Sequence, residues 1–131
     1  MPDISCNAII VSCIDFRIQE HINAWADTYL GEYNFDRMLY AGGAKDFYHV
    51  MEQIELSHDL HHIKKVVLVN HEDCGAYGDE GTEEKIKADL IKAEEKIEAL
   101  EQGVDVETYY LKLDGTFEEV SRHSPRFVKK D

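Results

Sequence analysis

Val69-Asn70-His71-Glu72-Asp73-Cys74-Gly75 decides the expected fold, together with a stretch far earlier in the chain, Ser12-Cys13-Ile14-Asp15-Phe16-Arg17. Each stretch follows a run of apolar, largely β-branched residues, at positions 8–11 in one case and 66–69 in the other. Runs of this kind are typical of strands that are buried on both faces of a parallel sheet. We therefore expect two parallel strands, each with a polar segment at its carboxyl end.

The polar segments contain three residues of types that commonly bind metals. If the two strands are neighbours, Cys13, His71 and Cys74 meet at their carboxyl ends, where ligands bind in sheets of this type. Two thiolates and an imidazole form a zinc ligand set, and three protein ligands leave one position for water, as in catalytic zinc sites. The sequence therefore predicts a zinc enzyme, with Zn²⁺ as its cofactor.

The composition limits the class of protein. A chain of 131 residues, 44% apolar and 31% charged, is expected to form a single zinc domain over residues 1–131. Its net charge of -13 argues against nucleic acids and anionic membranes as partners, since both are polyanions. Three cysteines without a compact spacing indicate thiols or metal ligands and not disulfides. With no basic segment before the first apolar run, we expect a cytoplasmic protein.

Hydrophobic periodicity places further elements between and after these two strands. An α/β fold is predicted, with a four-stranded parallel sheet in the order second, first, third, fourth, a short antiparallel strand at its edge, and helices on both faces. The winding then reverses between the first and third strands, beside the three metal-binding residues. The expected parallel strands cover 8–13, 35–40, 66–69 and 108–113, the helices about 18–29, 46–63 and 82–102, and the antiparallel strand 116–120.

Asp15 and Arg17 follow Cys13 at alternate positions, so in an extended chain the three side chains fall on one side. Asp15 either accepts a hydrogen bond from zinc-bound water or occupies the fourth position on the metal itself. A bidentate pair with Arg17 would hold Asp15 away from the metal and keep it ionised. The open site would generate hydroxide near neutral pH, a nucleophile for a small electrophilic carbon.

These motifs resemble those of the β-class carbonic anhydrases. Their Cys-x-Asp-x-Arg segment is seen as Cys13-Ile14-Asp15-Phe16-Arg17, and their His-x-x-Cys-Gly segment as His71-Glu72-Asp73-Cys74-Gly75. Arg17-Ile18-Gln19-Glu20, Ala41-Gly42 and Tyr110-Leu111-Lys112-Leu113-Asp114-Gly115 are similar to further parts of the family's pattern. The resemblance covers most of the chain.

The resemblance implies the reversible hydration of carbon dioxide to bicarbonate by zinc-bound hydroxide, which is the activity of a zinc lyase. By similarity, Cys13, His71 and Cys74 are the zinc ligands, and Asp15 and Arg17 form the catalytic dyad. A four-stranded parallel core and a homodimer, or a higher homo-oligomer, with the active site at the interface are also implied.

Two departures from the family's pattern concern the substrate pocket. The helical arm that family members usually carry before the first strand has no counterpart in the few residues that precede position 8. Leu39-Tyr40-Ala41-Gly42-Gly43 stands where the family typically has Arg-Asn-Ala-Gly-Asn. The alternative is therefore a catalytically silent or substrate-altered zinc-binding relative, in which Asp15 closes the fourth position. A nucleotide-binding α/β domain is a third, weaker hypothesis.

Other residues receive ordinary interpretations. Cys6 is expected to be a simple thiol near the surface or edge of the sheet. Asp46 is expected to cap the second helix. His58, His61 and His62 are interpreted as solvated side chains near the carboxyl end of that helix.

Overall fold

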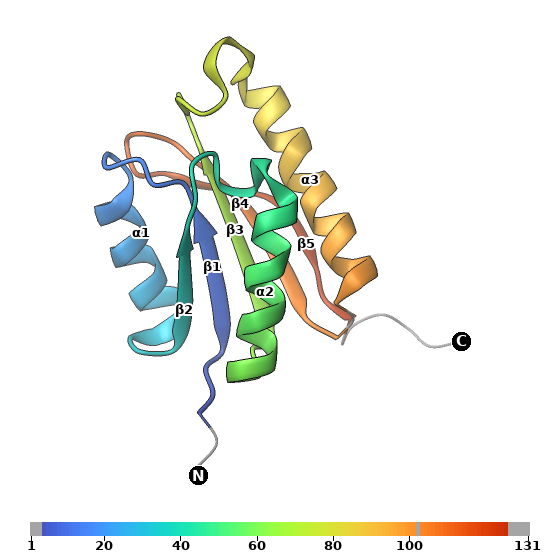
Figure 1. Cartoon of the computed structure of the whole chain (residues 1–131). Coiled ribbons are helices and arrows are strands. Elements are labelled where there is room, and N and C mark those ends of the chain that lie inside the picture. Colours follow the sequence, from blue (N-terminus) through green and yellow to red (C-terminus); the bar gives the residue numbers. More distant parts are fainter. Residues whose placement is uncertain (1–3, 102, 126–131) are drawn as a thin grey trace.

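A five-stranded sheet with the strand order β2-β1-β3-β4-β5 forms the centre of the computed structural model, which describes residues 4–101 and 103–125 (Figure 1). The elements follow one another as β1 (Ala8–Ser12), α1 (Gln19–Ala26), the π-helical turn η1 (Asp27–Gly31), β2 (Phe35–Leu39), the short turn η2 (Gly43–Lys45), α2 (Phe47–His61), β3 (Lys65–His71), the short turn η3 (Gly78–Glu80), α3 (Glu83–Leu100), β4 (Asp105–Leu111) and β5 (Phe117–His123).

The strand order and directions confirm the predicted α/β sheet. Strands β2, β1, β3 and β4 are parallel, and β5 is antiparallel to β4. In the pairing of β1 with β3, Ser12 lies opposite Val69, so the two strands end side by side. The chain moves to one side of β1 to form β2 and to the other side to form β3 and β4, so the winding reverses between β1 and β3, as predicted.

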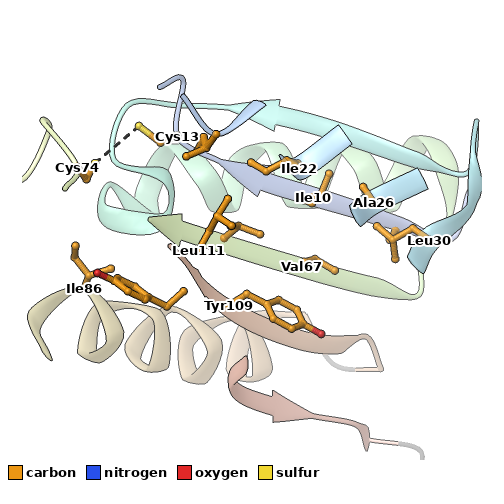
Figure 2. Close-up of a cluster of buried hydrophobic side chains, with 14 of the residues drawn as sticks. Ile10, Cys13, Ile22, Ala26, Leu30, Val67, Cys74, Ile86, Tyr109 and Leu111 are labelled. Atoms are coloured by element: carbon orange, nitrogen blue, oxygen red, sulfur yellow. Dashed lines mark hydrogen bonds between the residues drawn. The ribbon is translucent and has the colours of Figure 1, made fainter. Parts of the chain in front are cut away.

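Alternate residues of the strands point to opposite faces of the sheet and pack into two separate hydrophobic cores. On one face Ile10 and Val67 pack with the apolar side of α1, a cluster that Figure 2 shows in close-up. On the other face Ile9 and Leu68 pack with α2 and α3. Helices thus cover both faces, as predicted, and Figure 1 shows α1 apart from the α2 and α3 layer. Residues 66–71 of β3 are buried without interruption for this reason.

The last two strands differ from their predicted bounds. The fourth strand begins at Asp105 and ends at Leu111, and β5 reaches His123, which makes it as long as β4 and not short. Glu107 explains the early start, because its buried carboxylate accepts hydrogen bonds from the hydroxyls of Tyr29 and Tyr109 and pairs with Lys65 at 2.9 Å. Two of these partners, Tyr29 and Lys65, are distant in the sequence, so Glu107 gives no local strand signal.

The second helix also differs in detail from what was expected. The Asp46 side chain does not cap the backbone of α2; it accepts a hydrogen bond from the Tyr40 hydroxyl at 3.2 Å. His58 and His61 are half-buried and paired with acids, with His58 Nδ1 3.3 Å from Glu101 Oε1 and His61 Nδ1 2.7 Å from Asp36 Oδ2. The interpretation of these two histidines as solvated was therefore wrong.

The third helix begins as its sequence predicts, with the Lys85 backbone N–H donating to Thr82 Oγ1. Its predicted last residue, position 102, lies outside the described residues, as do positions 126–131 of the polar tail. Among the residues that the structure describes, none of the helices combines the length and apolar character needed to cross a lipid bilayer.

The turn after β2 depends on Gly43, which has a φ of +58°. A Cβ at this position would overlap Asn70 Oδ1, the atom that accepts the Ala44 backbone N–H at 3.0 Å. Replacing Gly43 with alanine is expected to lower the free energy of unfolding by about 2 kcal/mol, through backbone strain and steric overlap. Urea denaturation measures this loss.

Gly75→Ala is the matched control, because a Cβ there has nothing within 4 Å and the backbone does not adopt a positive φ. We expect its stability to stay within about 0.5 kcal/mol of the parent. Equal losses in both variants would contradict the role assigned to the turn at Gly43.

Candidate metal centre

Two loops at the carboxyl edge of the sheet bring Cys13, His71 and Cys74 together. Cys13 directly follows β1, His71 ends β3, and Cys74 lies in the turn that follows, where Asp73 adopts a left-handed φ of 56°. The two sulfur atoms are 3.9 Å apart, and a dashed line joins the two residues in Figure 2. One donor atom from each of the three residues lies within 4.8 Å of the others, and all three residues are buried.

His71 presents one free nitrogen to this cluster. Its Nδ1 lies 2.7 Å from the Glu72 carbonyl oxygen, which only accepts hydrogen bonds, so Nδ1 carries the ring proton. Its Nε2 keeps a lone pair, is fully buried, and has no hydrogen-bond partner within the described part of the chain. A buried acceptor without a partner is costly, and a backbone carbonyl that fixes the tautomer is typical of metal-binding histidines. The residues present therefore fit a metal ion.

The two thiols share one proton. The hydrogen bond with Cys74 lowers the pKa of Cys13 to about 3, helped by the Gly42 backbone N–H, which donates to the Cys13 sulfur at 3.3 Å. The same thiolate, together with burial, raises the pKa of Cys74 well above its usual range. A divalent cation bound between the sulfurs would replace that proton and neutralise both thiolates.

Asp15 is held by Arg17 beside the cluster. Asp15 Oδ1 accepts from the Arg17 backbone N–H at 2.8 Å and from Nε at 3.0 Å, and Oδ2 accepts from Nη2 at 2.7 Å. This pairing lowers the pKa of Asp15 to about 2, so the carboxylate is ionised at neutral pH. Asp15 Oδ2 lies 3.9 Å from His71 Nε2. Both carboxylate oxygens of Asp15 therefore accept hydrogen bonds from Arg17, at the edge of the group formed by Cys13, His71 and Cys74.

Arg17 also reaches the other loop. Its Nη1 donates to Asp73 Oδ2 at 3.1 Å and its Nη2 to the Asp73 carbonyl oxygen at 3.0 Å. Asp73 was not singled out from the sequence, although an acidic residue directly before Cys74 was the available signal. One guanidinium therefore joins the loop that carries Cys13 to the loop that carries Cys74.

Two further positioning residues were missed. Gln19 Nε2 donates to the carbonyl oxygens of Cys13 at 3.0 Å and of Asp15 at 2.8 Å. Asn70, buried at the end of β3, accepts the Ala44 N–H and so holds the turn whose Gly42 N–H reaches Cys13. Gln19 lies in the stretch Arg17-Ile18-Gln19-Glu20, whose similarity to the family's pattern was the available signal, whereas the role of Asn70 had no such signal. Together they fix the shape of the Cys13 loop.

Comparisons with known proteins agree with this geometry. Residues 4–121 match a family model described as putative carbonic anhydrase. An uncharacterised protein of Rickettsia conorii is 29% identical over 133 residues, which cover 87% of this chain and 72% of that protein. A carbonic anhydrase from Streptococcus mutans has a TM-score of 0.68 at 17% identity, covering 92% of this chain and 86% of that one.

Other solved structures share the fold. The tetrameric β-carbonic anhydrases of Sordaria macrospora match with a TM-score of 0.61 at 16% identity, covering 92% of this chain and 84% of theirs. An apo carbon disulfide hydrolase matches with a TM-score of 0.67 at 14% identity, covering 95% and 82%. At these identities the likenesses show the fold alone.

The geometry predicts different effects of substitution at Cys13 and Asp15. Cys13→Ser is expected to weaken zinc binding by about 100-fold or more and to lower the melting temperature, because metal-binding energy is also folding energy. Asp15→Asn is expected to change zinc affinity by less than about tenfold, since Asp15 is bonded to Arg17 and is not among the three grouped donors. Competition with a chromophoric chelator measures both affinities.

A comparable loss in the Asp15 variant would show that this carboxylate is a ligand and closes the site. Full retention of zinc by Cys13→Ser would remove Cys13 from the ligand set.

Proposed function

The chain belongs to the family described as putative carbonic anhydrase, and from that premise we propose that it is a zinc-dependent carbonic anhydrase. In this proposal Cys13, His71 and Cys74 hold the zinc ion, and Asp15 and Arg17 act beside it in the reversible hydration of carbon dioxide to bicarbonate. The observation that carries the proposal is the buried His71 Nε2, unpartnered among the described residues and grouped with two thiols.

Zinc, when bound, is a Lewis acid that lowers the pKa of water and supplies a nucleophile for carbon dioxide near neutral pH. Asp15 Oδ2, which lies 3.9 Å from His71 Nε2, would accept a hydrogen bond from a water at this site and orient it. Because its pKa is about 2, Asp15 is too acidic to retain a proton at neutral pH, so the proton passes on to buffer or another base. Arg17 keeps Asp15 ionised and in place.

The second candidate is a relative with an altered substrate, or with no activity. The fold is shared with a carbon disulfide hydrolase, and Leu39 and Tyr40 stand where the resemblance places an arginine and an asparagine. Carbon disulfide resembles carbon dioxide in being a small linear molecule with an electrophilic carbon, so the same residues would serve either reaction.

Pairing of two copies is part of the proposal. Phe16, between Asp15 and Arg17, is 87% exposed, and its neighbour Ile14 is 59% exposed. Large apolar side chains beside a site are typical of surfaces that a partner covers. Strand β2 also ends the sheet with a free edge among the described elements. We therefore propose a homodimer, or a higher homo-oligomer, that covers Phe16.

From its three free thiols we propose that the protein resides in a reducing compartment, the cytoplasm. Cys6, Cys13 and Cys74 are free, and the 3.9 Å between the Cys13 and Cys74 sulfurs leaves them open to oxidation in the absence of metal. Their function as ligands requires the reduced state.

Stopped-flow measurement of carbon dioxide hydration with a pH indicator tests the function. The zinc-loaded protein is expected to exceed the buffer rate, and Asp15→Asn and Arg17→Gln are expected to lower kcat/KM by roughly 100-fold while zinc stays bound. Asp79→Asn is the control, because it removes the same charge from the exposed turn η3. We expect it to leave the rate unchanged.

A zinc-loaded parent that hydrates carbon dioxide no faster than buffer would rule out the proposed carbonic anhydrase activity. An assay with carbon disulfide as the substrate, which follows the release of hydrogen sulfide, then decides whether the protein has an altered substrate or no activity.

Sedimentation velocity tests the assembly. The parent is expected to sediment as a dimer or larger species, and Phe16→Asp is expected to shift it toward monomer by placing a charge in the covered surface. Tyr33→Asp is the matched control, because Tyr33 is fully exposed and lies in the turn before β2. A monomeric parent at all concentrations would contradict the proposed dimer.

A further inference from the structure

A second group of metal-binding side chains lies at the opposite end of the sheet. Cys6 precedes β1, Asp36 is the second residue of β2, and His61 is the last residue of α2. One donor atom from each lies within 4.8 Å of the others. In Figure 1 the segment before β1 and the carboxyl end of α2 lie near the N-terminus, away from the loops that carry Cys13 and Cys74.

Backbone contacts hold the three residues together. The Cys6 N–H donates to the His61 carbonyl oxygen at 3.1 Å, which joins the start of β1 to the end of α2. Asp36 lies opposite Ile9 in the register of β1 with β2. The group is therefore built from rigid elements, so the convergence does not depend on flexible surface side chains.

Within the group, the Asp36 carboxylate faces the His61 ring, and the Cys6 thiol donates to the Ala8 carbonyl oxygen at 3.5 Å. Asp36 Oδ2 accepts a hydrogen bond from the buried Ser57 hydroxyl at 2.6 Å and lies 2.7 Å from His61 Nδ1. Each of the three residues is half-buried, which leaves access for an ion from solvent.

From this arrangement we propose that Cys6, Asp36 and His61 bind a second divalent metal ion of the zinc class. A thiolate, a carboxylate and a neutral imidazole suit a borderline ion better than calcium or magnesium, which prefer oxygen ligands. The thiolate and the carboxylate balance the charge of the ion. On binding, the Cys6 thiol would release its proton to solvent, and water from solvent would fill the remaining position.

The ion would have a structural role. It would link the edge strand β2, the entry to β1 and the end of α2, which otherwise meet only through hydrogen bonds and packing. Its binding energy would add to the stability of the fold. The catalytic proposal does not depend on it, because the Cys13 centre lies at the other end of the sheet.

Metal content after zinc loading and gel filtration, measured by mass spectrometry, tests the proposal. The parent is expected to retain about two zinc ions per chain, one at each centre, and Cys6→Ser and Asp36→Asn about one. His62→Asn is the control: it removes the neighbouring imidazole, and asparagine tolerates the left-handed backbone of that position. It should keep about two.

Cobalt provides a second readout that does not need activity. Titration of the parent is expected to show two phases of thiolate-to-cobalt charge transfer, and Cys6→Ser is expected to lose one. Should Cys6→Ser fail to fold, His61→Gln serves in its place.

A parent that retains only one zinc ion, with Cys6→Ser unchanged from it, would overturn the second site. Absence of carbon dioxide hydration would not affect this stoichiometry, so the two proposals fail independently.

Discussion

The parallel pairing of β1 with β3 is the constraint on which the candidate centre depends. Because Ser12 lies opposite Val69, the residues that follow each strand emerge side by side, and residues 61 positions apart place their sulfur atoms 3.9 Å from each other. Burial of β3 on both faces makes this register hard to shift, since a slip of one residue would turn its apolar side chains to the wrong core. The position of Cys13 relative to Cys74 thus follows from the packing of the whole sheet.

The charges of the groups around Cys13, His71 and Cys74 are fixed by the contacts between these groups. Arg17 takes both oxygens of Asp15 and also binds Asp73, so one cation holds two acidic loops together and lowers the pKa of Asp15. The thiol pair keeps one proton, and His71 keeps a bare nitrogen. The cluster therefore lacks positive charge at its centre, and the two carboxylates at its rim outnumber the one guanidinium, so a divalent cation would be attracted to it.

Much of the architecture followed from local signals. The strands and helices were predicted correctly because β-branched runs and helical stripes are local properties, and the strand order followed from the connection rules for alternating strands and helices. The bounds of β4 and the pairing of His61 were not, because Glu107 and Asp36 are satisfied by residues distant in sequence. The role of Asn70 was not predicted for the same reason, since its hydrogen bond joins β3 to the turn after β2.

The sequence by itself determined the candidate ligands, their order along the chain and the α/β class, because these depend on residue type and on periodicity. Only the tertiary structure decided that the three donors meet, that His71 exposes Nε2 to the cluster and that Asp15 gives both oxygens to Arg17. It alone brought Cys6, Asp36 and His61 together. The physical reason is that distances between side chains arise from strand register and backbone turns, which residue spacing does not specify.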